Sequence, residues 1–167
     1  MSSLEPPDIF FLSAAIGWSE LGDPVEAEAE LARITPENQG HPDVLEVRWS
    51  LLAQAQRWEA ALEIARALLQ HAPLRSSSWL HHAYALRRAP GGGLRQAWDA
   101  LLPASEKFPG EPTIPYNLSC YACQLQQLEE ARTWLRRALQ LGAKDKMKAM
   151  ALQDPDLQPL WGEIPEL

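Results

Sequence analysis

The chain has 167 residues and a formal net charge of −7, with 46% hydrophobic and 22% charged residues. It is long enough to bury a core of its own, and no apolar run approaches the roughly 20 residues that a membrane span requires. We therefore expect no membrane insertion. Because the negative charge opposes a phosphate backbone, we also expect no nucleic-acid partner.

The first residues of the chain lack the features of a secretory signal. The stretch from Ser3 to Phe11 carries Glu5 and Asp8 where such a signal would carry lysine or arginine. The apolar run that follows has the pattern of a repeat helix. We therefore expect no export signal and a cytoplasmic protein.

Four alanines then recur along the chain at a nearly constant spacing. Ala27, Ala61, Ala97 and Ala131 are separated by 34, 36 and 34 residues, and in each copy apolar residues lie three before, four after and seven after the alanine. This spacing marks one face of a helix. A helical unit of this length cannot bury its face alone, so neighbouring units must stack. The repeat predicts an all-α fold of stacked helix pairs, an α-solenoid.

The alanines also define the borders of the units. We predict a single domain over residues 1–167, in which each unit has two antiparallel helices joined by a short turn and residues 146–167 cap the last unit. The four predicted units span residues 8–41, 42–75, 76–111 and 112–145.

The turns carry residues that stop and start helices. Gly22 ends one helix, and Asp23 opens the next as N-cap with Pro24 at the first helical position and Glu26 completing a capping box. In the third unit, three glycines at residues 91–93 follow a proline. No Gly-Lys-Ser/Thr follows them and no strand precedes them, so we favour a slack turn over a phosphate-binding loop.

The four units, over about residues 8–145, resemble the tetratricopeptide repeat (TPR) family, in its bacterial form. The third unit matches the TPR pattern at Trp79, Ala83, Leu86, Ala97, Ala104 and Pro109. The fourth contains Tyr-Asn-Leu-Ser-Cys-Tyr at residues 116–121 and Leu-Glu-Glu-Ala at residues 128–131, both typical of these repeats. The second unit departs from the pattern because Trp49 stands at a normally small position. The resemblance implies a right-handed superhelix of about four repeats with a C-terminal capping helix.

Aromatic residues and the tail complete the predicted core. Trp18, Trp58 and Trp79 occupy pattern positions that pack between helices, whereas Trp98 and Trp134 are expected between adjacent units or on the outer face.

The tail should close the open end of the stack. Asp154 and Pro155 open a short final helix, whose Leu157, Leu160 and Trp161 should cover the last unit. The alternative for this helix is a detachable peptide that occupies a groove.

The sequence offers few candidates for catalytic, redox or metal-binding residues. Cys120 and Cys123 form a Cys-x-x-Cys motif, but it falls inside a predicted helix without the strand and helix N-terminus of redox proteins. We interpret both cysteines as structural or groove-lining. We expect no catalytic residue, no metal site and no cofactor, and therefore no enzyme.

The TPR resemblance implies where a partner would bind. In these repeats the first helix of each unit lines a concave groove, and the resemblance implies that positions two, five, six, nine, twelve and thirteen of each unit point into it. The candidate groove residues are Glu46, Ser50, Leu80, His81, Tyr84, Arg87, Arg88, Tyr116, Asn117 and Cys120.

The function predicted from this groove is that of a protein-interaction adaptor, a monomer or weak homodimer, that binds a peptide or helix of a partner protein. Two alternatives remain at this point: a secretion-type chaperone with TPR repeats, and a thiol- or metal-dependent enzyme using Cys120 and Cys123.

Overall fold

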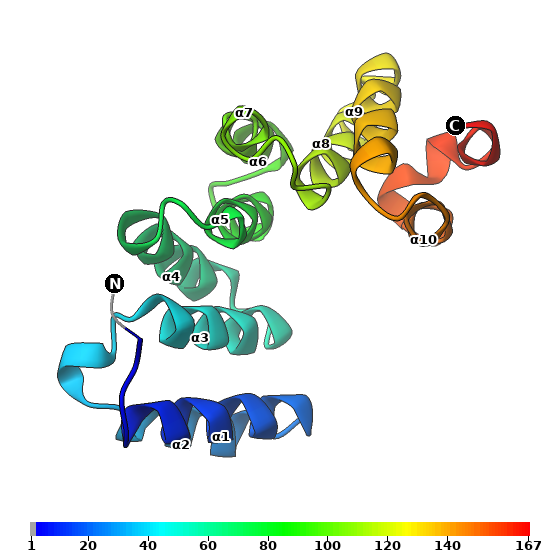
Figure 1. Cartoon of the computed structure of the whole chain (residues 1–167). Coiled ribbons are helices and arrows are strands. Elements are labelled where there is room, and N and C mark those ends of the chain that lie inside the picture. The colour runs from blue at the N-terminus through cyan, green and yellow to red at the C-terminus, as the bar shows by residue number, and fades with distance from the viewer. Residues whose placement is uncertain (1–2) are drawn as a thin grey trace. The chain divides into compact units, whose positions relative to one another are not determined.

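The computed structural model describes residues 3–167, and all regular secondary structure in that range is helical (Figure 1). The α-helices are α1 (Asp8–Glu20), α2 (Pro24–Arg33), α3 (Pro42–Gln54), α4 (Trp58–His71), α5 (Ser76–Arg88), α6 (Leu94–Leu101), α7 (Ala104–Lys107), α8 (Thr113–Gln124), α9 (Leu128–Leu141) and α10 (Lys144–Ala151). The short 3-10 helices are η1 (Pro36–Asn38), η2 (Pro155–Leu160) and η3 (Ile164–Glu166). Among these described helices, none has the length and apolar content needed to cross a membrane.

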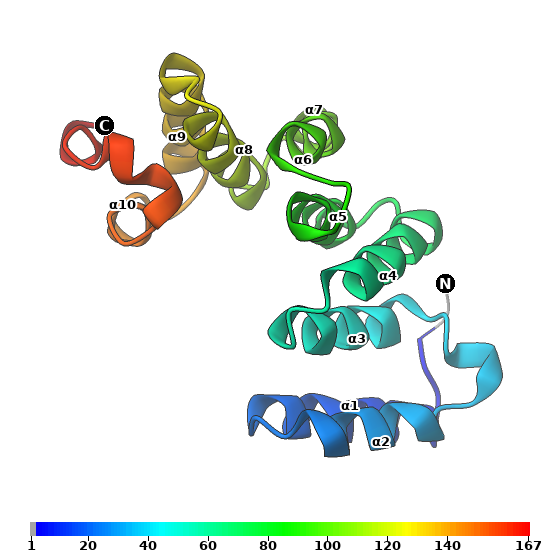
Figure 2. The ribbon, with the colours of Figure 1, turned by 180° about the vertical axis from the view of Figure 1, so that it is seen from behind.

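The helices group into two compact units. The first unit ends at His81 and the second begins at His82, so the division falls within α5. Within the first unit α1 packs beside α2 and α3 beside α4, and within the second α8 packs beside α9 (Figures 1 and 2). The fold is thus an all-α helical repeat built from consecutive helix pairs.

The second half of the third predicted unit is broken into two helices. α6 ends at Leu101 and α7 begins at Ala104, with Pro103 between them. A proline has no N–H to continue the helical hydrogen bonds, and its ring crowds the preceding turn. The break therefore follows from Pro103, which the repeat pattern alone did not reveal.

Turns inside the helix pairs share one hydrogen-bonded form. A residue with positive φ ends the first helix of three pairs: Gly22 at +79°, Gln56 at +55° and Gln126 at +62°. The next N–H then donates to the carbonyl five residues earlier, from Asp23 to Trp18 (2.9 Å), from Arg57 to Leu52 (2.8 Å) and from Gln127 to Ala122 (2.9 Å). These are Schellman-type helix ends, which satisfy carbonyls that the helix leaves open.

The predicted capping box at α2 forms only in part. The Asp23 carboxylate accepts a hydrogen bond from the Glu26 N–H at 3.1 Å, as expected of an N-cap. The N–H of Asp23, which a complete box would give to the Glu26 side chain, instead donates to Trp18 at the end of α1. The helix end of α1 thus competes with the box and takes this donor.

The three glycines form a turn between α5 and α6, as predicted, but the turn is tight and not slack. Gly91 has a φ of +76°, and a Cβ on Gly92 would lie 1.8 Å from the carbonyl oxygen of Leu86. The N–H of Gly93 donates to that same carbonyl at 3.0 Å. Glycine is needed here because the backbone folds directly over the end of α5.

The repeat alanines lie in the core, as the spacing predicts. Ala27, Ala61, Ala97 and Ala131 are each 0% exposed. Because alanine has the smallest side chain that still favours a helix, each lets two helices approach closely.

The tryptophans divide between core and surface differently from the prediction. Trp18, expected in the core, is 37% exposed on α1, and that prediction is wrong. Trp58 and Trp79 are partly buried. Trp98 is buried and meets Trp134 edge-on at 6.1 Å between ring centroids, so of the two expected positions Trp98 takes an inner one, at a contact between α6 and α9.

The C-terminal segment closes the second unit. The side chain of Asp154 accepts a hydrogen bond from the Asp156 N–H at 3.0 Å and so starts η2 as an N-cap. Leu157 and Leu160 are fully buried, whereas Trp161 remains partly exposed and donates its indole N–H to Ala151. The predicted closing helix is confirmed, in 3-10 form, with two leucines as its apolar anchors.

Candidate functional site

A pocket of about 440 Å³ lies on the first unit between α1, α3 and the start of α5. Its lining residues are Leu12, Ile16, Asp43, Glu46, Val47, Ser50 and His81. One wall is apolar and the other is acidic and polar, which is the composition of a site that holds an amphipathic segment.

The apolar wall exists because of the unusual sequence of α1. Between Asp8 and Glu20 this helix carries no charged residue, and a helix that is apolar all round is normally buried on every side. Leu12 belongs to the core cluster of the unit, but Ile16, one turn later, is 41% exposed. The exposed part of the helix thus provides the apolar wall that Val47 of α3 extends.

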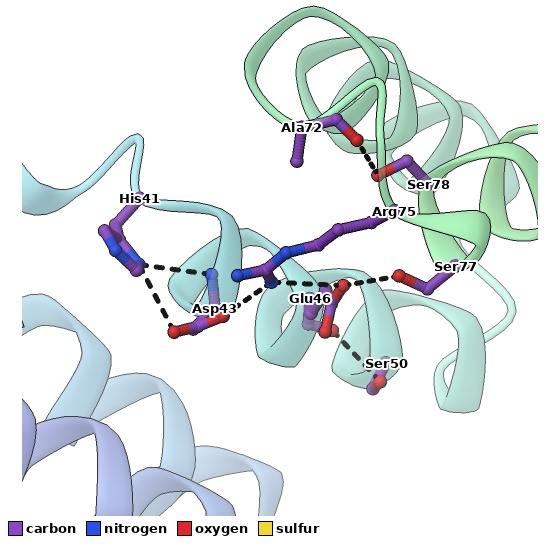
Figure 3. Close-up of polar contacts among 8 residues, drawn as sticks. All are labelled: His41, Asp43, Glu46, Ser50, Ala72, Arg75, Ser77 and Ser78. Carbon is purple, nitrogen blue, oxygen red and sulfur yellow. Dashed lines mark hydrogen bonds and ion pairs between the residues drawn. The ribbon is translucent and has the colours of Figure 1, made fainter. Parts of the chain in front are cut away.

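The acidic wall is organised by one arginine (Figure 3). Nη1 of Arg75 lies 2.6 Å from an Asp43 carboxylate oxygen and 3.5 Å from a Glu46 carboxylate oxygen. The hydroxyl of Ser77 also donates to Glu46, at 2.7 Å. The two carboxylates, one turn apart on α3, are thereby held at the pocket rim and already accept one cation.

Two other lining residues have internal partners. The hydroxyl of Ser50 donates to the Glu46 carbonyl of its own helix at 3.0 Å. The imidazole of His81 stacks on Trp49, with 3.8 Å between ring centroids and 16° between planes. Burial lowers the pKa of His81, and nearby Glu46 offsets part of this effect, so the ring is neutral at pH 7. The stacking also explains why a tryptophan is tolerated at position 49, where the TPR pattern normally has a small residue.

A second pocket, of about 500 Å³, lies next to the first near the N-terminus of α3. His41 lines it and also accepts a hydrogen bond from the Asp43 N–H at 3.3 Å, as the N-cap of α3 (Figure 3). The other histidine in its lining, His71, contacts the Gly40 carbonyl through Nδ1 at 2.8 Å. Both imidazoles therefore have a structural partner.

In the second unit, groove-position side chains gather around the C-terminal segment. Arg87 pairs with Asp156 through its two terminal guanidinium nitrogens, with Nη2 at 2.8 Å from Oδ1. The Tyr116 hydroxyl donates to Asp154 at 3.0 Å, and the Cys120 thiol lies 3.5 Å from the same carboxylate oxygen. Three candidate groove residues are thus occupied by residues 154–156.

The two cysteines are poorly suited to nucleophilic or metal chemistry. Both are buried and free. Burial raises the pKa of the Cys120 thiol and of the Cys123 thiol, and Asp154 and Asp156 add to the effect. Because the reactive and metal-binding form is the thiolate, these environments favour the structural interpretation.

Cys120, Asp154 and Asp156 bring three potential metal-ligand atoms within 4.8 Å of one another. Their atoms are already engaged, because Arg87 bonds both oxygens of Asp156 and Tyr116 bonds Asp154. The arginine charge would also repel a cation. The donor set does not favour a metal here.

The remaining candidate residues make local contacts. Leu80 is partly buried and lies outside the pocket lining. The guanidinium of Arg88 lies 3.6 Å above the ring of Tyr84, and Asn117 donates to Thr113 of its own helix at 2.9 Å. The structure thus groups Glu46, Ser50 and His81 around one pocket, and Arg87, Tyr116 and Cys120 around one segment.

Sequence reasoning missed several residues at these sites. Leu12 and Ile16 stand at the fifth and ninth positions of the first unit, and Gln124 stands at the thirteenth position of the fourth. The structure places the first two in the pocket and bonds Gln124 to the Asp156 carbonyl at 3.0 Å. These positions are the ones used to select the other candidates, so the same rule applied to every unit would have found all three.

No family model matches the sequence. No curated protein matches it either. Solved structures nevertheless share its fold. A thermophilic TPR protein from Thermus thermophilus superposes with a TM-score of 0.70 at 20% identity, covering 96% of this chain and 100% of that one. MamA from Desulfovibrio magneticus RS-1 gives a TM-score of 0.69 at 16% identity, covering 80% of this chain and 75% of that one. The chain therefore has the fold of TPR proteins.

Proposed function

We propose that this protein is a non-catalytic interaction module that binds a segment of a partner protein in the pocket lined by α1, α3 and His81. The observation that carries the proposal is the exposed Ile16 beside the paired carboxylates of Asp43 and Glu46. Covering an exposed apolar side chain such as Ile16 with a partner is favourable, because it removes apolar surface from water.

The chemistry of the pocket defines the partner segment. Leu12, Ile16 and Val47 suit an apolar anchor side chain, and the carboxylates suit a neighbouring lysine or arginine. Asp43 and Glu46 carry two negative charges against the single positive charge of Arg75, so one negative charge is left for a basic group of the partner. The partner is thus an amphipathic helix or extended peptide with one basic residue next to its apolar anchor.

We place this module in the cytoplasm. Cys120 and Cys123 are both free thiols, a state that a reducing compartment maintains. Binding through the pocket requires no catalytic group, and a monomer suffices because all lining residues come from the first unit of one chain.

The pocket can be tested with peptides selected from a random library displayed on phage. Selected peptides should carry a basic residue beside an apolar one, and Ile16→Arg should weaken their binding by about tenfold or more, because the new charge blocks the apolar wall and pairs with Asp43 or Glu46. Phe10→Arg is the matched control, since Phe10 is 63% exposed on the same helix and lies outside the pocket lining.

Fluorescence titration of purified variants gives the two affinities. The control should stay within about twofold of the wild type. Selected peptides that bind Ile16→Arg as tightly as the wild type would place the binding surface elsewhere.

A further inference from the structure

The second unit contains a recognition surface that its own chain already fills. Four side chains at groove positions of α5 and α8 contact residues 154–156, and we name this set the α5–α8 face. Its members are Arg87, Tyr116, Cys120 and Gln124.

The contacts have the pattern of peptide recognition. Arg87 holds the Asp156 carboxylate with two nitrogens, the geometry that gives arginine its specificity for carboxylates. Gln124 donates to the backbone carbonyl of the same aspartate at 3.0 Å, and the Tyr116 hydroxyl donates to Asp154 at 3.0 Å. The face thus contacts two carboxylates and one backbone carbonyl at the N-terminal end of η2.

We propose that the α5–α8 face is a binding site for an acidic segment of a partner protein, with two aspartates one residue apart, and that residues 154–156 mask it in cis. This site lies in the second unit and is independent of the pocket on the first. It gives the chain a second ligand class, opposite in charge to the first.

The polar and apolar parts of the C-terminal segment differ in how easily a competing ligand can displace them. The side chains of Arg87 and Asp156 are 17% and 26% exposed, so a competing carboxylate can reach the ion pair. Leu157 and Leu160, by contrast, are fully buried and keep the segment anchored. The polar contacts can therefore open while the cap stays in place.

Masking in cis makes a quantitative prediction. A segment joined to its own site competes at an effective concentration in the millimolar range, so a partner peptide binds the wild type only weakly. Replacing the two cis carboxylates removes the ion pair of the competing segment with Arg87 and leaves every residue of the face. The double variant Asp154→Asn with Asp156→Asn should therefore bind an acidic peptide about tenfold or more tightly than the wild type.

The experiment uses full-length protein and a fluorescent peptide with the sequence of residues 153–158, Gln-Asp-Pro-Asp-Leu-Gln. Fluorescence anisotropy measures its affinity for the wild type and the double variant. Adding Arg87→Gln to the double variant should abolish the gain, and a peptide with asparagine in place of both aspartates should not bind. Ile16→Arg should leave these affinities unchanged, which separates this site from the pocket.

Three results would overturn the proposal. The first is a folded double variant that binds no better than the wild type, and the second is equal binding of the asparagine peptide. Should the double variant not fold, Asp154→Asn alone keeps the Arg87 ion pair and should still show a smaller gain. The proposal also predicts that an excess of acidic peptide accelerates hydrogen exchange at the Asp156 and Leu157 amides of the wild type. Unchanged exchange rates at these amides are the third overturning result.

Discussion

A single carboxylate fixes the N-terminal end of α1 and so positions the apolar wall of the pocket. Asp8 is 2% exposed and accepts three hydrogen bonds, from the Thr35 hydroxyl at 2.6 Å, the Asn38 amide at 2.7 Å and the Thr35 N–H at 3.0 Å. The bond from the Thr35 hydroxyl contributes most to lowering the pKa of Asp8, and the Asn38 bond adds to it. The charged form of Asp8 therefore stabilises the contact between α1 and the chain after α2.

Replacing Asp8 by alanine should destabilise the protein more at pH 7 than at about pH 3. A carboxyl whose pKa is lowered on folding contributes stability above its unfolded pKa of about 3.9, and this contribution is lost as the pH falls through the native value. Urea unfolding followed by tryptophan fluorescence measures the difference from wild type at each pH.

The exposed Glu28 on α2 provides the control for this test. Glu28→Ala should have little effect at either pH. An equal loss of stability for Asp8→Ala at both values would mean that the charge of Asp8 contributes nothing.

The helix pairs owe their close packing to the repeat alanines. On α2, Ala27 is 0% exposed while Ala29 on the same helix faces solvent. A larger side chain at the buried position would have to push the neighbouring helix away, because protein interiors are close-packed. The same substitution two residues later meets no such obstacle.

Ala27→Leu should therefore lower the free energy of unfolding by about 1–3 kcal/mol through overpacking. Ala29→Leu, its matched control, should change it by less than about 0.5 kcal/mol. Chemical denaturation of both variants tests the prediction. Equal stability of the two variants would contradict the role assigned to the alanine.

Much of the helical framework could be predicted from the sequence because its signals are local. The spacing of the alanines and the glycine and proline at the first turn indicate where helices begin and end. Pro103 and Trp18 show the limit of this reasoning. The repeat pattern does not weigh a proline between its fixed positions, and it assigns a core role to Trp18 although this side chain is 37% exposed on α1.

The candidate site could be predicted only in part. Groove positions identified Glu46 and His81 because each helix repeats the same geometry. The partners of Arg87 and Tyr116 could not be read from the pattern, since Asp156 lies 69 residues after Arg87 and reaches it only through the fold of the tail. The sequence of the C-terminal segment does not by itself indicate which side chains of other helices the segment will contact.

The two units of the molecule present complementary chemistry. The first offers an apolar and acidic pocket for a segment with a basic residue, and the second offers the α5–α8 face for an acidic segment. Each site lies within its own unit, so each can be inactivated separately. We therefore expect two independent binding activities from one chain of repeats.

The most direct test of the pocket as a partner site is photo-crosslinking in the cells that produce the protein. A benzoylphenylalanine replaces Ser50 in the pocket lining or, as the control, the exposed Val25 on α2. We predict a crosslinked partner from Ser50 that disappears when Ile16→Arg is added, and no such product from Val25. The same partner from both positions, or a Ser50 product that survives Ile16→Arg, would contradict the proposed site.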